Sequence, residues 1–460
     1  MTPTMPAAPP RPIAGPPREY RFPRSTRHRL ANGLGVIVAP MRSYPITTVL
    51  AMIDVGATSD ARGVEGLTSL MATALAEGTA TMDALALAER LERVGSTLDA
   101  GADWDSTVVQ LSALPSRLDD AMAVLAEVLQ APAFPATDVE RLVAERQAQI
   151  AQARTEPRAL ADRSFEYIAY APSSRFVHSA GGNRLSVARL DRDALVRHHA
   201  THVRPTSTTV IVVGDIGTDE ALALVERHLG GWTGVAPTVT AIDTSRRHAS
   251  RSVRIVPMPE AAQAELRLGH VAVPRAHPDY FALTLMNAVL GGLFSSRINM
   301  NLREAHGWTY GAHSSFDWRR QASPFHVSTA VATEVTADAV RETLGEIDRI
   351  REAPVSAEEL SLATSYLDGV FPIRYETTSA VASALANQHV FGLPEDYHDT
   401  YRSRVRAVTT DDVLRVARTH LAPDAMQVVV AGDADALTAP LAALGVGPVE
   451  ILPIAALDTD

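Results

Sequence analysis

Histidine spacing is the first indicator of metal chemistry in this sequence of 460 residues. Two His at positions i and i+4 of a helix share one face and can bind one metal ion, and a nearby Glu can activate the bound water. None of the fifteen His is followed by Glu either directly or three residues later. His198 and His202 have the i, i+4 spacing, but no acidic residue separates them. We interpret this pair as surface or capping residues and expect no metal site.

Other catalytic chemistries also lack their residues. The chain has no Cys, which excludes thiolate nucleophiles, disulfides and Cys-ligated metals. A Gly-x-Ser-x-Gly elbow is missing, so an autonomous serine hydrolase is disfavoured. Gly214-Asp215 and Gly432-Asp433 resemble fragments of phosphate loops, but no Gly-Lys-Ser/Thr follows them. We interpret both pairs as turns that end strands.

The composition is that of an ordinary globular protein, with 46% hydrophobic and 21% charged residues. A net charge of -11 argues against a nucleic-acid partner. We expect no membrane span, because no segment reaches the roughly 18 apolar residues that one needs. The Pro-rich N-terminus shows no signal-peptide core. A soluble protein of the bacterial cytoplasm or periplasm is expected, and the sequence does not decide between these compartments.

The sequence repeats one pattern at a fixed distance. DALVRHHATHVRPTSTTVIVVGD runs from Asp193 to Asp215, and DDVLRVARTHLAPDAMQVVVAGD runs from Asp411 to Asp433. Matching Asp, His, Pro and Gly-Asp residues all lie 218 positions apart. Each copy shows helical periodicity, then a Pro and a β-rich run, which indicates two copies of one domain. His198 corresponds to Val416, so the His pair is not repeated.

We divide the chain into a Pro-rich flexible arm (1–24), an N-terminal domain (25–235), a linker (236–251), a C-terminal domain (252–450) and a tail (451–460). The N-terminal domain combines strand patterns with helical ones. Strands are predicted on both sides of Asn32-Gly33 and at 46–55 and 107–113, and helices at 64–77, 82–94, 118–129 and 137–153. This pattern predicts an α+β fold, in which each domain has a mainly antiparallel sheet with helices on one face.

The chain resembles the M16 (pitrilysin-like) metallopeptidases of the two-domain subfamily B. The resemblance rests on VEGLTSLMATALAEGT in the first half and on NAVLGGLFSSRINMNLREAHGWTYGAHSSF and YETTSAVASALANQHVFGLPEDY in the second. It implies two homologous M16/LuxS-like domains. The family's zinc site is a His-x-x-Glu-His helix completed by a later Glu. Here those positions fall on Ser69, Ala72, Thr73 and Gln149. The resemblance therefore implies a degenerate metal site that holds no cofactor.

The family also uses an Arg and a Tyr from the C-terminal domain, which match Arg303 and Tyr310. The resemblance implies that they bind the substrate backbone and stabilise an oxyanion. We expect Arg303 in the last turn of a helix from about Asp279, which Gly307 ends, and Tyr310 at the start of the next strand. In the alternative interpretation, Arg303 pairs with Glu304 and Tyr310 packs on the sheet. Gly291-Gly292 is either a substrate-contacting loop or a packing feature.

This pattern predicts the inactive subunit of a heterodimeric M16B zinc metallopeptidase. Its partner would be a zinc-bearing sister subunit, and the substrate a peptide enclosed between the two chains. Alone, the chain is expected to be inactive. The alternative is a structural subunit without proteolytic activity, similar to the core proteins of the respiratory bc1 complex.

Overall fold

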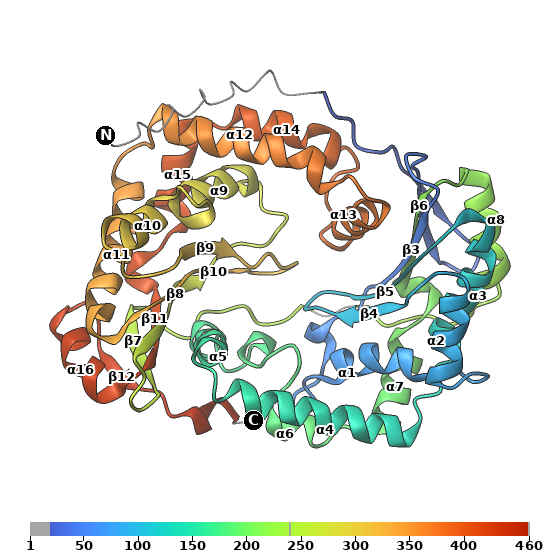
Figure 1. Cartoon of the computed structure of the whole chain (residues 1–460), viewed down its shortest axis with the longest axis horizontal. Helices are drawn as coiled ribbons and strands as arrows, with labels where there is room; N and C mark the ends of the chain where they lie inside the picture. The colour runs from blue at the N-terminus through green and yellow to red at the C-terminus, as the bar shows by residue number, and fades with distance from the viewer. Residues whose placement is uncertain (1–18, 239–240, 459–460) are drawn as a thin grey trace, which may run out of the picture.

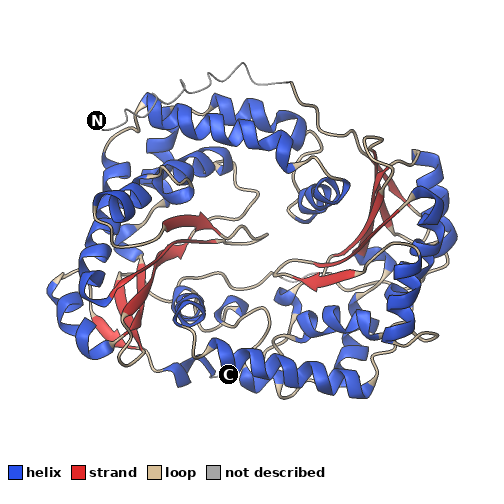
Figure 2. Cartoon of the chain, in the orientation of Figure 1, coloured by secondary structure: helices blue, strands red, loops and turns tan. Residues whose placement is uncertain are grey.

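Two six-stranded mixed sheets form the framework of the protein (Figures 1 and 2). This computed structural model describes residues 19–238 and 241–458. The strand orders are β1-β2-β6-β3-β5-β4 and β12-β7-β11-β8-β10-β9, and antiparallel pairs outnumber parallel ones in both. The sheets stand on opposite sides of the molecule, with most helices on their outer faces (Figure 1). The predicted α+β fold with two repeated domains is confirmed.

The first half forms the elements that its periodicity predicts. Its strands are β1 (Thr26–Arg29), β2 (Gly35–Pro40), β3 (Thr47–Ile53), β4 (Asp99–Ala102), β5 (Thr107–Ala113) and β6 (Thr208–Gly214). Its helices are α1 (Leu67–Ala74), α2 (Ala84–Arg93), α3 (Leu118–Gln130), α4 (Ala136–Ala153), α5 (Pro157–Ala169), α6 (Arg184–Val187), α7 (Arg192–His202) and α8 (Thr218–Leu229).

The second half repeats this arrangement. Its strands are β7 (Ser252–Pro257), β8 (Gln263–Val271), β9 (Ala312–Phe316), β10 (Pro324–Ala332), β11 (Gln427–Gly432) and β12 (Val449–Ile451). Its helices are α9 (Tyr280–Asn287), α10 (Arg297–Asn299), α11 (Thr336–Glu352), α12 (Ala357–Arg374), α13 (Thr378–Val390), α14 (Tyr397–Ala407), α15 (Thr410–His420) and α16 (Ala434–Ala443). Helices α7 and α15 start and end 218 residues apart, as the repeat predicts.

The central strands are buried on both faces. In β6, Val210 and Val212 belong to a core shared with the outer helices of the first half, whereas Ile211 and Val213 pack on the opposite face. β11 shows the same alternation, with its valines divided between two cores. A strand covered on both sides reads as a continuous apolar run, which explains TTVIVVG and QVVVAG.

The second face of each sheet is covered by a helix from the other half. Helix α13, of the second half, packs on β3 and β6 of the first sheet through Val381, Leu385 and their neighbours (Figure 1). Helix α5, of the first half, packs on β8 and β11 of the second sheet through Leu160 and Phe165. The helices therefore cover both faces of each sheet, and not one face as the sequence predicts.

Parts of the predicted arm, linker and tail are packed into the fold. Residues 1–18 of the arm lie outside the described residues, but Phe22 is buried and Tyr20 donates a hydrogen bond to the carbonyl of Tyr375. In the linker, Arg246 donates to the carbonyl of Val271. The predicted tail completes β12, and its Leu457 is buried against α5.

The predicted helix from Asp279 to Arg303 is interrupted. Helix α9 continues into π-helical turns at Ala288–Gly292, and the chain is extended at Leu293 before α10 and a second set of π-helical turns at Met300–Ala305. Gly307 has a positive φ of 67° and follows the last turn, as predicted. Tyr310 lies in a loop, and the next strand begins at Ala312, so its predicted place at the start of the strand is wrong.

The segment Tyr280–Ala305 has the length and apolar composition of a membrane-spanning helix, which the sequence analysis did not find. More than half of its most apolar window is buried inside the protein. A buried core helix meets the same criteria, so this is weak support for a span.

The exchanged helix α13 should contribute directly to stability. Leu385 is 1% exposed between α13 and the first sheet. We expect Leu385→Ala to lower the free energy of unfolding by about 2–5 kcal/mol, because it leaves a cavity between the two halves. Urea unfolding of the whole chain measures this. Leu362→Ala, in the neighbouring α12 but 50% exposed, is the control and should change it by less than about 0.5 kcal/mol. Equal effects would contradict the packing role of α13.

Candidate functional site

The four positions of the degenerate metal site lie together on α1 and α4. Ser69 is half-buried, and Thr73 is exposed one turn later on the same helix. The Thr73 hydroxyl donates to the carbonyl of Ser69 at 3.1 Å. Ala72 is fully buried, and Gln149 is exposed on α4. The side chains present are thus two hydroxyls, a methyl group and an amide.

An arginine that the sequence analysis did not consider joins these positions. Arg146, one turn before Gln149 on α4, donates one hydrogen bond to Ser69 Oγ at 3.0 Å and another to Gln149 Oε1 at 3.2 Å. Hydroxyl and amide groups are poor zinc ligands beside imidazole and carboxylate, and a guanidinium repels a metal cation. These residues do not fit a zinc ion.

Helix α1 is held from its start by a buried polar cluster. Asp60 accepts hydrogen bonds from the backbone of Gly66 and Thr68, both at 2.9 Å, and from Arg175. The Thr68 hydroxyl also bonds Asp60 and lies 2.9 Å from His198 Nε2. His198 is buried and contacts α1, so its interpretation as a surface or capping residue is wrong.

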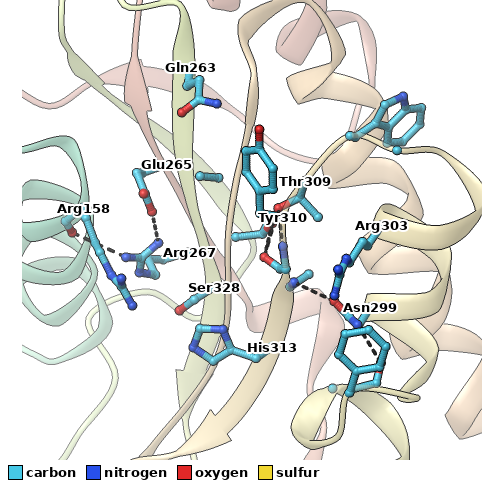
Figure 3. Close-up of a pocket in the computed structure, with 18 of the residues that line it drawn as sticks. Arg158, Gln263, Glu265, Arg267, Asn299, Arg303, Thr309, Tyr310, His313 and Ser328 are labelled. Carbon is cyan, nitrogen blue, oxygen red and sulfur yellow. Dashed lines mark hydrogen bonds and ion pairs between the residues drawn. The ribbon is translucent and has the colours of Figure 1, made fainter.

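A cavity of about 870 Å³ opens in the second half and gathers the other predicted residues (Figure 3). Its floor is the inner face of β8 and β10, next to the start of α5. Its walls are the loop that follows the second set of π-helical turns and the segment after α9. Gly291, Gly292, Arg303 and Tyr310 all line this cavity. The lining residues come from the second half and α5, so α1 and α4 do not share it.

Tyr310 and Arg303 present free donors to the cavity. The Tyr310 side chain is 96% exposed, and its hydroxyl has no hydrogen bond to the described residues. Arg303 lies over the ring of Phe294, with 4.6 Å between the guanidinium carbon and the ring centre. Its Nε is 3.5 Å from Glu304, a distance typical of weak surface pairs. In Figure 3 the Tyr310 ring and the Arg303 guanidinium extend in different directions.

The structure bears on the alternative interpretations of Arg303, Tyr310 and Gly291. The Arg303–Glu304 pair exists but engages only Nε and leaves the terminal nitrogens available. Packing of Tyr310 on the sheet is excluded by its exposure. Gly291 serves both interpretations, because it lines the cavity and a Cβ there would lie 2.5 Å from Ser314 Oγ.

The cavity floor also carries charged residues that the sequence did not predict as part of the site. Arg267 is buried and pairs with Glu265 at 2.8 Å and with Asp162 of α5. Arg158, at the start of α5, and His313, on β9, complete this polar floor. Glu265 and Arg267 lie on the same face of β8, and Ser328 of β10 pairs with Arg267 on that face. This grouping can be predicted only when the pairing of β8 with β10 is known.

Among the described residues, His277, Asp279 and His420 are close enough together to hold a metal ion. Asp279 already accepts hydrogen bonds from His420 at 2.7 Å and Arg415 at 2.8 Å. These bonds lower the pKa of Asp279 to about 2, and the bond from Arg415 has the largest effect. The cluster ties the start of α9 to the end of α15, and the Arg415 charge opposes a cation there.

Two family models match the chain. One described as "Insulinase (Peptidase family M16)" matches residues 36–174, and one described as "Peptidase M16 inactive domain" matches residues 189–367. Together they cover more than half of the sequence.

Curated relatives include proteins described as uncharacterized zinc proteases and one described as a non-peptidase homolog. The chain is 27% identical to an uncharacterized zinc protease of Mycobacterium tuberculosis, over 85% of this chain and 90% of the relative. It is 23% identical to a non-peptidase homolog of Helicobacter pylori, over 77% of this chain and 82% of that protein. It is 24% identical to subunit 1 of the mitochondrial cytochrome b-c1 complex of Bos taurus, over 58% and 56% respectively.

The fold matches solved structures. A crystal structure of a peptidase M16 inactive domain from Pseudomonas fluorescens aligns with a TM-score of 0.84 at 23% identity, over 89% of this chain and 98% of that chain. At this identity the match shows a common fold.

The buried His198 should make stability depend on pH. Burial lowers its pKa to about 3, whereas an ordinary His titrates near 6.5. The contribution of neutral His198 is fully present above pH 6.5. It falls as pH decreases toward 3, by up to about 1.4 kcal/mol per pH unit, because only the unfolded state takes up the proton. We expect His198→Asn to flatten this fall in urea unfolding measured across that range. The surface variant His28→Asn is the control, and an unchanged slope in His198→Asn would contradict the assignment.

Proposed function

This chain belongs to the M16 peptidase family, and on that basis we propose that it is the non-catalytic subunit of a heterodimeric peptidase of subfamily B. A sister subunit would hold the zinc ion, and this chain would contribute part of the wall around a bound peptide. Relatives described as zinc proteases and as a non-peptidase homolog are compatible with such a pair.

The observation that carries the proposal is a contrast between two parts of the chain. The positions that we predict for the metal site hold Ser, Ala, Thr and Gln, and an arginine lies among them. In contrast, Arg303 and Tyr310 line an open cavity with donors that have no strong partner. A tyrosine exposed to this degree gains almost no stabilisation from packing within the chain. Its exposure supports a contact with a bound peptide or with the partner subunit.

The chemistry assigned to these residues is hydrogen-bond donation. A peptide carbonyl under attack develops negative charge on its oxygen, and preorganised donors stabilise that charge. The terminal nitrogens of Arg303 and the hydroxyl of Tyr310 are the donors that this chain would supply. Because the two groups extend in different directions, they would have to turn toward the same carbonyl when the partner and the peptide bind.

The chain alone should neither bind zinc nor cleave peptides. We expect less than one-tenth of an equivalent of zinc by atomic absorption after dialysis against micromolar zinc, since its metal-site residues are poor ligands. Stoichiometric zinc, or cleavage of an unfolded peptide by the purified chain, would contradict the proposal.

Peptidase activity should appear with the zinc-bearing sister subunit and depend on Arg303. We expect Arg303→Ala to lower kcat of the pair by about 100-fold at unchanged zinc content, the effect of losing one oxyanion donor. Tyr310→Phe tests the second donor. Arg341→Ala, an exposed arginine of α11 outside the cavity, is the matched control. Full activity of the Arg303→Ala pair would remove the catalytic-assistance role.

The second candidate function is a structural subunit of a larger complex. It is favoured by the similarity to subunit 1 of the cytochrome b-c1 complex. Purification of the tagged chain from its native cells separates the two candidates. A zinc peptidase partner supports the first, and a membrane complex without peptidase activity supports the second.

A further inference from the structure

Arg146 occupies a built position between α1 and α4. Its guanidinium bridges Ser69 Oγ and Gln149 Oε1, one on each helix. Its plane rests against Gly181, where a Cβ would lie 3.1 Å from both Cζ and Nη1. A Cβ at position 181 would therefore require the guanidinium to shift by a few tenths of an ångström. Three separate segments shape the site around this one cation.

The charge of Arg146 is not balanced inside the chain. Both acceptors are neutral, and no carboxylate of the described residues lies within 4.0 Å of its nitrogens. Three buried arginines have acidic partners, since Arg175 contacts Asp60, Arg267 contacts Glu265 and Arg319 contacts Glu166. Buried Arg275 has none among the described residues, but it lies against the ring of Tyr280 and donates to the Tyr397 hydroxyl. Partial burial also lowers the pKa of Arg146 from its ordinary value, a sign that its charge is poorly solvated.

The groups around Arg146 are donors without partners of their own. The Ser69 hydroxyl proton and the Gln149 amide protons have no acceptor among the described residues. The guanidinium retains further N–H groups beyond its two hydrogen bonds. A metal site directs lone pairs at a cation. Here the N–H groups of Arg146 and Gln149 and the Ser69 hydroxyl can donate hydrogen bonds, and the guanidinium carries a positive charge. Such a set of groups suits an anion and not a metal cation.

We propose that Arg146, Ser69 and Gln149 form a binding site for a carboxylate of the peptide substrate, at the position of the family's metal centre. A guanidinium matches a carboxylate in a two-bond fork, and Ser69 and Gln149 can each donate one bond more. The carboxylate is the C-terminus of the peptide or an Asp or Glu side chain. This inference rests on the proposed function, because it requires a peptide to reach α1 and α4.

The test is a comparison of three ten-residue peptides by calorimetry with the full chain alone. The first has a free C-terminal carboxylate and no acidic side chain, the second is its amide, and the third is the amide with one internal Gln replaced by Glu. We expect at least one of the two carboxylate peptides to bind ten-fold or more tightly than the neutral amide. Preference for the first identifies a C-terminus, and preference for the third identifies a side chain.

Two variants decide whether Arg146 is responsible. Arg146→Gln should abolish the preference. Gln149→Glu should also abolish it while keeping the fold and the α1–α4 contact, because it supplies an internal carboxylate next to the guanidinium. Arg141→Gln is the matched control, since it removes an equal charge from α4 that Glu77, Asp138 and Glu145 already neutralise.

Equal affinity for all three peptides would overturn the proposal, and so would a preference that survives both variants or a lack of saturable binding at millimolar concentration. These outcomes are separate from the test of Arg303, which measures activity of the pair. A peptide that binds without preference removes the carboxylate site and leaves the proposed function intact.

Discussion

The central strands of both sheets are apolar on both faces, and the rest of the architecture depends on covering them. The outer faces are covered by helices of the same half, but the inner faces need α13 and α5 from the opposite halves. Each half forms an outer core from its own residues, but the inner core over each sheet contains residues of both halves. The repeated domains of the sequence are therefore packed into each other, although each contributes all the strands of one sheet.

The same exchange places the functional groups. Helix α5 covers only part of the second sheet, and the polar sheet surface beyond its first turn becomes the floor of the cavity. Helix α4 ends at Ala153 and α5 begins at Pro157, so a short turn joins Arg146 and Gln149 to Arg158 in the cavity. The positions predicted for the metal site and the Arg303–Tyr310 cavity are thus connected in sequence by two consecutive helices and a short turn.

Sequence patterns predicted much of this, but only where the signal is local or repeated. The offset of 218 residues identified the two domains. The family resemblance implied roles for Arg303 and Tyr310, which line one cavity together with Gly291 and Gly292. The continuous apolar runs of β6 and β11 indicate that both faces of each strand are buried. They do not indicate that the helix packed on the inner face comes from the other half of the chain. Arg146 was not predicted, because the zinc motif concerns only the positions of the metal ligands and the base. The role of Arg146 depends on its contacts with Ser69 of α1 and with Gly181, which are distant in sequence. The break near Leu293 was missed because apolar composition continues across it.

The exchange of helices also has a consequence for biosynthesis. The first sheet is complete in sequence at Gly214, but the helix that covers its inner face ends at Val390. At a synthesis rate of about 5–20 residues per second, that interval lasts roughly 10–35 s. During this time α13 is not yet available to cover Leu50, Met52 and Ile211 on the inner face of the first sheet. A first sheet that forms before α13 is translated therefore exposes an apolar surface of the kind that promotes aggregation.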